Sequence, residues 1–158
     1  MDEKTDRLRF LAEDAVQGFT AYCGLRPVTI EPGRFVTRVL LREHHLQQDG
    51  IAHAGLIATL ADHTAGYASY TLVPKNRRIL TVEYKINFLA PARGEALECR
   101  ARVIKPGRSL LVAESEVYAL RGEDEILVAK ALLTMAAVPV EKLAKPAGPR
   151  PQRPSRSR

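Results

Sequence analysis

One acidic side chain, Asp62, lies in the middle of an otherwise almost wholly apolar stretch, His53–Leu72. At about 100° of rotation per residue in a helix, small residues share its face: Gly55, Ala58, Thr59, Ala65, Gly66 and Ser69. Glycine inside a helix costs about 1 kcal/mol relative to alanine. These positions therefore indicate either close packing or room for a ligand. The carboxylate itself is either a structural hydrogen-bonding group or a general base.

The segment before this stretch reads Gln47-Gln-Asp-Gly-Ile-Ala-His-Ala-Gly55, a glycine-bearing loop that enters a helix. The first N–H groups of a helix lack intrahelical partners and carry the positive end of its dipole, so they can hold a developing oxyanion. Asp62 follows about two turns later. Donors at the helix start and a carboxylate further along form a layout suited to hydrolysing an ester-like carbonyl.

The elements that must position these groups follow from periodicity. A long helix is predicted over His53–Leu72 and is closed by Pro74. A second helix is predicted over Thr5–Gly18. Strands are predicted over Cys23–Ile30, Arg34–Leu41, Arg78–Ala90, Glu95–Ile104, Ser109–Leu120 and Glu125–Val138.

The strand Arg78–Ala90 alternates, with Leu80, Val82, Tyr84, Ile86 and Phe88 on one face and Thr81, Glu83, Lys85 and Asn87 on the other. Short turns between successive strands predict a four-stranded antiparallel meander after the long helix and a hairpin before it. The last strand is apolar on both faces, so we expect it in the centre of the sheet or covered by a partner subunit. The fold class is α+β, with a curled antiparallel sheet wrapped around a long central helix.

Two segments carry a resemblance to a known family: Gly50-Ile-Ala-His53-Ala-Gly55, with Asp62 nine positions after His53, and Thr81–Pro91. They resemble the PaaI-like (phenylacetyl-CoA thioesterase type) acyl-CoA thioesterases, which have the hotdog fold. The resemblance covers roughly residues 30–138. It implies hydrolysis of an acyl-CoA thioester to free acid and CoA. The four histidines do not form a zinc-binding pattern with carboxylates or thiolates in the sequence, so no metal site is expected, and no cofactor is expected either.

The resemblance also implies roles at single positions. Asp62 is the general base that activates water, or the nucleophile that forms an anhydride. The Ala54 N–H, helped by Gly55, holds the thioester oxyanion. Gln47 contacts the reacting carbonyl or water, and Thr81 positions water from the opposite subunit, so that the active site lies at a dimer interface. We expect His53 to orient the helix start rather than to act as a base.

Two departures from the family pattern fall at the helix start. Ala54 stands where the family has the first glycine of a His-Gly-Gly string, and Gln47 stands where many members have asparagine. The Ala54 N–H survives the change, although the methyl group adds bulk near the thioester.

The resemblance implies that CoA contacts the segment Phe88–Arg93 and the turn Lys105–Ser109. Basic side chains in both suit the CoA phosphates. The residues expected to bind CoA are Ala90, Pro91, Arg93, Lys105, Gly107, Arg108 and Ser109. The expected assembly is a homodimer, paired further into a homotetramer as a dimer of dimers.

Composition bounds the remaining possibilities. The 158 residues are 46% hydrophobic and 27% charged, as in a single globular domain, and contain no apolar run of membrane-spanning length. Residues 1–140 hold 18 basic and 17 acidic side chains, and residues 141–158 hold six and one, so the net charge of +6 belongs mostly to the tail. We expect an N-terminal helix (1–18), a thioesterase domain (19–140), a disordered basic tail (141–158), a cytoplasmic location, and neither membrane nor nucleic-acid binding by the folded part.

The other reactive side chains have simpler interpretations. His44 and His45 are expected to lie on the surface or to pack in a loop, and His63 points about 100° away from Asp62, which disfavours an Asp–His pair. Cys23 and Cys99 are interpreted as core residues.

Three alternatives to a thioesterase are open. The first is a non-catalytic acyl-CoA-binding or sensing protein, motivated by Ala54. The second is a hydratase or dehydratase, although its usual Gly-Asp-x-Asn-Pro-x-His string is absent. The third is an accessory nucleic-acid-binding role for the tail.

Overall fold

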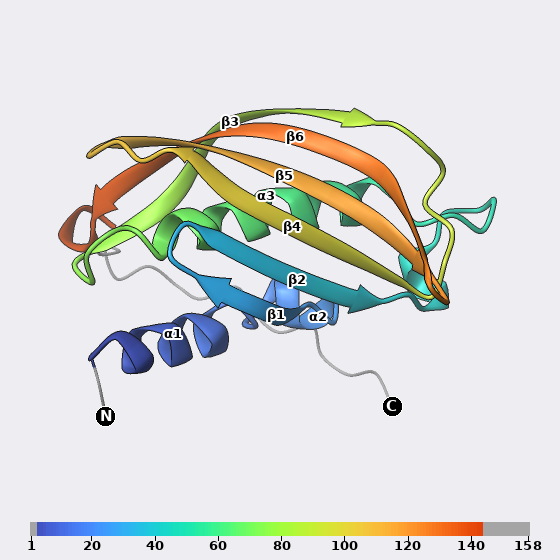
Figure 1. Ribbon diagram of the computed structural model, residues 1–158, viewed down its shortest axis with the longest axis horizontal. Coiled ribbons are helices and arrows are strands. Elements are labelled where there is room, and N and C mark those ends of the chain that lie inside the picture. Colours follow the sequence, from blue (N-terminus) through green and yellow to red (C-terminus); the bar gives the residue numbers. More distant parts are fainter. Residues whose placement is uncertain (1–2, 144–158) are drawn as a thin grey trace, which may run out of the picture.

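A computed structural model describes residues 3–143, which form one six-stranded antiparallel sheet curled over a long helix (Figure 1). Short 3₁₀ turns lie at Glu43–His45 and Val140–Lys142. The helices and strands are α1 (Glu3–Asp14), α2 (Phe19–Tyr22), β1 (Arg26–Glu31), β2 (Arg34–Leu40), α3 (Ala54–Tyr70), β3 (Arg77–Phe88), β4 (Ala96–Lys105), β5 (Leu110–Arg121) and β6 (Asp124–Pro139).

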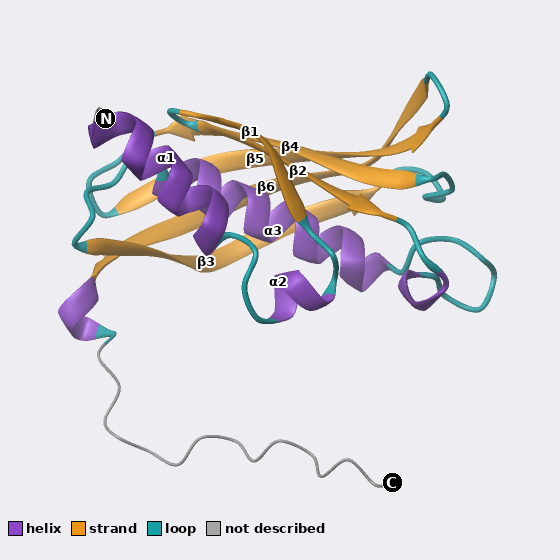
Figure 2. Cartoon of the chain, turned by 90° about the horizontal axis from the view of Figure 1, so that it is seen from below, coloured by secondary structure: helices purple, strands orange, loops and turns teal. Residues whose placement is uncertain are grey.

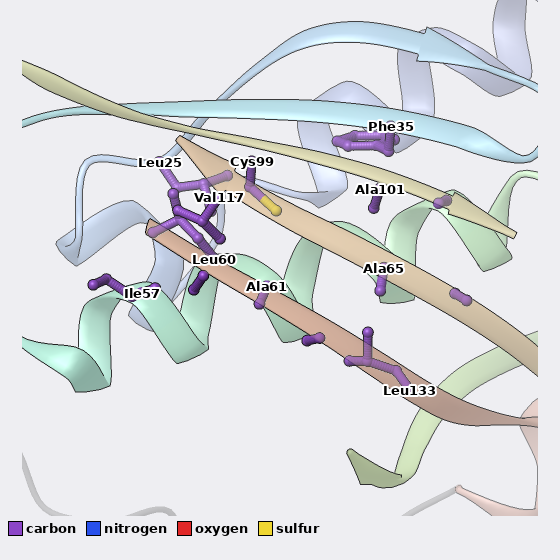
Figure 3. Packing of buried hydrophobic residues seen from close by; sticks show 14 of the residues in the cluster. Leu25, Phe35, Ile57, Leu60, Ala61, Ala65, Cys99, Ala101, Val117 and Leu133 are labelled. Carbon is purple, nitrogen blue, oxygen red and sulfur yellow. The ribbon is translucent and has the colours of Figure 1, made fainter. Parts of the chain in front are cut away.

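Helix α3 lies against the concave face of the sheet. Several of its apolar side chains are fully buried, among them Leu60, Ala61 and Ala65. Strands β2, β4 and β5 supply Phe35, Cys99 and Val117 to the same cluster (Figure 3). Burial raises the pKa of the Cys99 thiol to about 12, so both its position and its chemistry fit the expected role as a core residue.

The strand order is β1-β2-β4-β5-β6-β3, and it corrects the expected meander. Strand β3 does not pair with its successor β4. It forms the edge of the sheet and pairs with β6, with Thr81 opposite Met135 and Phe88 opposite Ala129. The chain leaves β3 through residues 89–95 and crosses to the far side of β6 and β5. This order places β6 between two strands, as its apolar faces predicted.

The convex face of the sheet carries paired charges. Glu98 on β4 is only 6% exposed and accepts hydrogen bonds from Arg38 of β2 (2.5 Å) and Arg100 (2.9 Å). Arg100 also reaches Glu125 at 2.5 Å. Burial removes hydration from the Glu98 carboxylate, and the guanidinium groups of Arg38 and Arg100 compensate for that loss.

The N-terminal segment lies beside the lower face of α3 (Figure 2). Helix α1 ends at Asp14, short of the expected Gly18, and α2 follows at residues 19–22. The strand expected over Cys23–Ile30 is observed as β1, which begins three residues later, at Arg26. Two glycines with positive φ, Gly18 (57°) and Gly24 (73°), break the chain into these pieces. The expected tail lies outside the described residues from 144 onward.

Candidate active site

The carboxylate singled out in the sequence has a partner on the neighbouring strand. The Thr81 hydroxyl of β3 donates a 2.6 Å hydrogen bond to Asp62 Oδ1 of α3. Both residues belong to one chain, so the expectation that they come from opposite subunits is wrong for this pair. The reason is that β3 packs along α3 within the protomer. Asp62 is partly buried and Thr81 is exposed, so solvent and ligand can reach the pair.

A β-bulge follows Thr81, which faces the helix. The register of β3 against β6 shifts between Thr81 and Glu83, so that Thr81 lies opposite Met135 and Tyr84 lies opposite Leu133. Met135 and Leu133 are fully buried on the concave side. Residues directly opposite in a ladder share a face, so Thr81 and Tyr84 both face α3. The alternation expected from the sequence, with Thr81 opposite in face to Tyr84, is therefore wrong at this point.

His53 caps the start of α3. Its Nδ1 accepts a 2.9 Å hydrogen bond from the Gly55 N–H. His53 is therefore placed to orient the helix start. The same hydrogen bond uses the Gly55 N–H, which is one of the two expected oxyanion donors. The Ala54 N–H is exposed, and within residues 3–143 it donates no hydrogen bond. The first turn of α3 therefore offers the Ala54 amide as its open donor.

The loop before α3 holds the other residues expected near the helix start. The Gln47 side chain turns back and accepts from the Asp49 N–H, and Gly50 adopts a φ of 72°. The Arg93 guanidinium donates to the Asp49 carbonyl at 3.4 Å. The Ala52 N–H donates to the Ala92 carbonyl at 2.9 Å. The segment containing Ala90, Pro91 and Arg93 thus lies beside the start of α3.

The turn containing Lys105, Gly107, Arg108 and Ser109 lies at the opposite end of the sheet. It joins β4 to β5, and the ten residues of β4 separate it from the helix start, a length of about 33 Å. A side chain at Gly107 would collide with the Leu110 carbonyl, which explains the glycine. One chain alone does not bring the two expected CoA-binding segments together.

A pocket of about 290 Å³ opens beside Asp62 and Thr81 and extends toward the C-terminal end of α3. Its other lining residues include Asp14 of α1, a position that no pattern in the sequence predicts. The Tyr67 hydroxyl donates to Asp14 at 2.8 Å. Burial and this contact raise the Tyr67 pKa, so the phenol stays protonated. The docking of α1 that brings Asp14 here is a non-local contact with no sequence signal.

His63 does not pair with Asp62. Its Nε2 lies 2.8 Å from the Ala15 carbonyl, which can only accept, so Nε2 carries the proton. Burial lowers the pKa of His63, and the ring stays neutral near neutral pH. The imidazole therefore ties α1 to α3 rather than acting on a substrate.

Larger pockets lie elsewhere. One of about 460 Å³ lies on the convex face among arginine and glutamate side chains, away from Asp62. Across residues 3–143, no three His, Cys, Asp or Glu side chains cluster so as to hold a metal ion. In the same part of the chain, no helix is both long and apolar enough to cross a membrane.

The fold and the site define a class of protein. Residues 49–126 match the family model described as the thioesterase superfamily. The structure superposes on that of a thioesterase family protein from Silicibacter pomeroyi with a TM-score of 0.80 and 38% identity, over 86% of this chain and 98% of that one. The chain therefore belongs to the thioesterase superfamily and has its hotdog fold.

Further similarities extend to other proteins of this fold and superfamily. The Escherichia coli PaaI protein has the same fold, with a TM-score of 0.73 and 18% identity over 85% of this chain and 93% of that one. Human acyl-coenzyme A thioesterase 13 is 30% identical over 84 residues, 52% of this chain and 59% of that protein. The chain spans 66% and 76% of the length of two other curated relatives, both named as esterases.

Proposed function

We propose that the chain is an acyl-CoA thioesterase, which hydrolyses an acyl-CoA thioester to a free acid and CoA. The observation that carries this proposal is the Asp62–Thr81 pair, a partly buried carboxylate held by a hydroxyl beside an open pocket. Membership of the superfamily supports the hydrolase class, and the name of the human relative supports the acyl-CoA substrate.

The chemistry follows from the groups present. Asp62 takes a proton from water, and the water oxygen attacks the thioester carbonyl carbon. The Ala54 N–H stabilises the oxyanion of the tetrahedral intermediate. The carbon–sulfur bond then breaks, and the proton passes from Asp62 to the departing CoA thiolate. If Asp62 instead attacks the carbonyl carbon directly, CoA thiolate leaves and an anhydride forms, which water then cleaves. When that water attacks the Asp62 carbonyl carbon, a single turnover in ¹⁸O-water labels the Asp62 carboxylate.

The complete site needs two protomers. Ala54 and Asp62 are eight residues apart on one helix, which separates them by about 12 Å along its axis. Water activated by Asp62 cannot attack a carbonyl held at that distance. The start of α3 from a second copy must therefore approach Asp62, which replaces the expected division between Asp62 and Thr81.

The edge strand β3 supports such a homodimer. Its side chains Leu80, Val82, Tyr84 and Phe88 are 42–57% exposed. A twofold axis beside β3 reverses the direction of the partner, so the β4–β5 turn of one protomer comes to the end where α3 of the other begins. This arrangement unites Lys105 and Arg108 with Arg93 for binding CoA. Pairing of dimers into a homotetramer stays a prediction.

The test is the Asp62→Asn variant, assayed for release of free thiol from acyl-CoA esters. Loss of a general base lowers the rate by about 10²–10⁴-fold, whereas CoA affinity, measured by calorimetry, stays within a few-fold of the wild type. Unchanged turnover in Asp62→Asn would remove this residue from the mechanism.

The second candidate is a non-catalytic acyl-CoA-binding protein. It is favoured by the capping of the Gly55 N–H by His53, which leaves one open donor at the helix start. Tight binding of acyl-CoA by the wild type without thiol release, over short, long and aromatic acyl groups, would support this candidate over the enzyme.

A further inference from the structure

Gly66 lies one turn after Asp62 inside α3, where glycine costs about 1 kcal/mol relative to alanine. Packing does not require this glycine. A Cβ built on Gly66 has no atom within 4 Å among the described residues, and the backbone is not in the positive-φ region. The missing side chain instead leaves space in the pocket beside Asp62, which Gly66 lines.

The volume of this pocket limits what it can hold. At about 290 Å³ it is roughly twice the size of a 150 Å³ cavity that accommodates benzene. Asp62 and Thr81 lie at one end, and Tyr70 and Arg78 also line the pocket. Tyr70 is eight residues beyond Asp62, about 12 Å along the helix. A compact group attached to a carbonyl at Asp62 fits this space, and a long chain does not.

The far part of the pocket is polar. Tyr70 is only 4% exposed, and its hydroxyl has no hydrogen-bond partner within residues 3–143. The Arg78 guanidinium lies 5.6 Å from the Tyr70 ring centroid, and its Nη1 donates to the Lys75 and Arg77 carbonyls.

The charges at this end are mixed. Asp14 lines the same pocket and accepts a hydrogen bond from the Tyr67 hydroxyl. Its negative charge is opposite to the positive charge of Arg78. An anionic group would meet Asp14 and Asp62, and a cationic group would meet Arg78. An uncharged oxygen is compatible with both, because it can accept from Arg78, and a hydroxyl can also donate to Asp14.

We infer that this pocket receives the acyl group of the substrate, and that the acyl group is compact and ends in an uncharged hydroxyl or carbonyl oxygen. Gly66 sets the size limit, and Arg78 selects the polar end. This inference rests on the proposed thioesterase function and adds the class of acyl group to it.

The size limit is tested with Gly66→Ala and Gly66→Leu. Acetyl-CoA, which is too short to reach Gly66, serves as the internal control substrate. We expect kcat/KM for hexanoyl-CoA to fall severalfold in Gly66→Ala and more than tenfold in Gly66→Leu, with acetyl-CoA hydrolysis changed less than threefold. Gly66→Ala should also raise the melting temperature. Equal losses on both substrates, or a changed oligomeric state in Gly66→Ala, would assign the glycine to packing and overturn the inference.

The polar end is tested with two acyl groups of equal heavy-atom number, 5-hydroxypentanoyl-CoA and hexanoyl-CoA. We expect the wild type to prefer the hydroxylated ester at least tenfold and Arg78→Met to lose most of that preference. Arg77→Met is the matched control, because Arg77 donates to the Ala137 carbonyl and does not line the pocket. A wild type without preference, or a preference retained in Arg78→Met, would contradict the inference.

Failure of the proposed function has a different signature. If the wild type releases no thiol from any ester, the thioesterase proposal fails while the pocket is still measurable. Calorimetric binding of the same two esters to the wild type, Gly66→Leu and Arg78→Met then decides. Weaker binding of both esters in Gly66→Leu, and loss of the hydroxyl preference in Arg78→Met, supports the pocket. Affinities unchanged in both variants overturn it.

Discussion

The Thr81 hydroxyl points at Asp62, and β3 carries one extra residue, Val82, directly after Thr81. Thr81 directly precedes this bulge and lies on the concave face, with its hydroxyl 2.6 Å from the Asp62 carboxylate. The contact leaves Oδ2 of Asp62 without a hydrogen bond from Thr81. One oxygen is thus held by the protein, and the other is available to accept a proton from water.

Substitutions of Thr81 distinguish the role of its hydroxyl in orienting Asp62 from the role of the side chain in packing. We expect Thr81→Ala to lower kcat by about 10-fold or more, because the carboxylate loses the donor that orients it, a contact worth about 1.5–3 kcal/mol when one partner is charged. Thr81→Ser keeps the hydroxyl and should retain activity within a few-fold. Steady-state thiol release measures both. Equal activity in the alanine and serine variants would show that the hydroxyl has no part in the reaction.

The Ala54 amide can be removed without removing a side-chain contact. Ala54 is the first residue of α3, a position that tolerates proline. The preceding residue, His53, has φ −62° and ψ 135°, which is also compatible with a following proline. We expect Ala54→Pro to fold normally by circular dichroism and to lose about 10²–10³-fold in kcat, the usual cost of one oxyanion donor.

Ala54→Gly is the control for that experiment, because it restores the glycine of the related pattern and keeps the N–H. Its activity should equal or exceed that of the wild type. Wild-type turnover in a folded Ala54→Pro protein would mean that the oxyanion is stabilised elsewhere.

The buried carboxylate of the convex face should matter for stability and not for turnover. Glu98→Gln removes the charge that Arg38 and Arg100 share, and we expect the free energy of unfolding to fall by about 1.5–3 kcal/mol. Glu125→Gln, on an exposed partner of Arg100, should have a much smaller effect. Urea denaturation measures both variants. A loss of stability as large in Glu125→Gln as in Glu98→Gln would rule out burial as the cause.

Two histidines make stability depend on pH. Burial lowers the pKa of His63 and of His45 in the folded chain. In the unfolded chain the pKa of both residues is about 6.5. As the pH falls below that value, the unfolded chain binds protons that the folded chain does not, so the free energy of unfolding decreases. His63→Asn should flatten this decrease between pH 7 and pH 5. Denaturation curves with the same pH slope in wild type and variant would contradict the assignment.

Local pattern was sufficient to predict most elements. The helix His53–Leu72 is observed as Ala54–Tyr70, and the strand Ser109–Leu120 as Leu110–Arg121. These elements follow periodicity and end at turn residues, which are properties of neighbouring residues. The positions of Asp62 in the helix and of His53 at its start could be predicted for the same reason.

The contacts that complete the site could not be predicted from local sequence pattern. Pairing of β3 with β6 joins residues far apart in sequence, and short connections favoured the wrong neighbour. The bulge at Val82 leaves no mark in the alternation of apolar residues. Asp14 reaches the pocket only because α1 docks on α3, where Leu11 and Ala15 are fully buried. Each of these depends on the free energy of the assembled fold rather than on a local preference.

The irregularity in β3 has a consequence for attempts to improve this protein. Deleting Val82 would restore continuous pairing with β6, and a screen for thermostability could select that change. The same deletion would keep Thr81 opposite Met135, on the face that lies against Asp62. A stabilised variant of this kind would therefore retain the contact between Thr81 and Asp62, so heat resistance can be selected in this strand without loss of that contact.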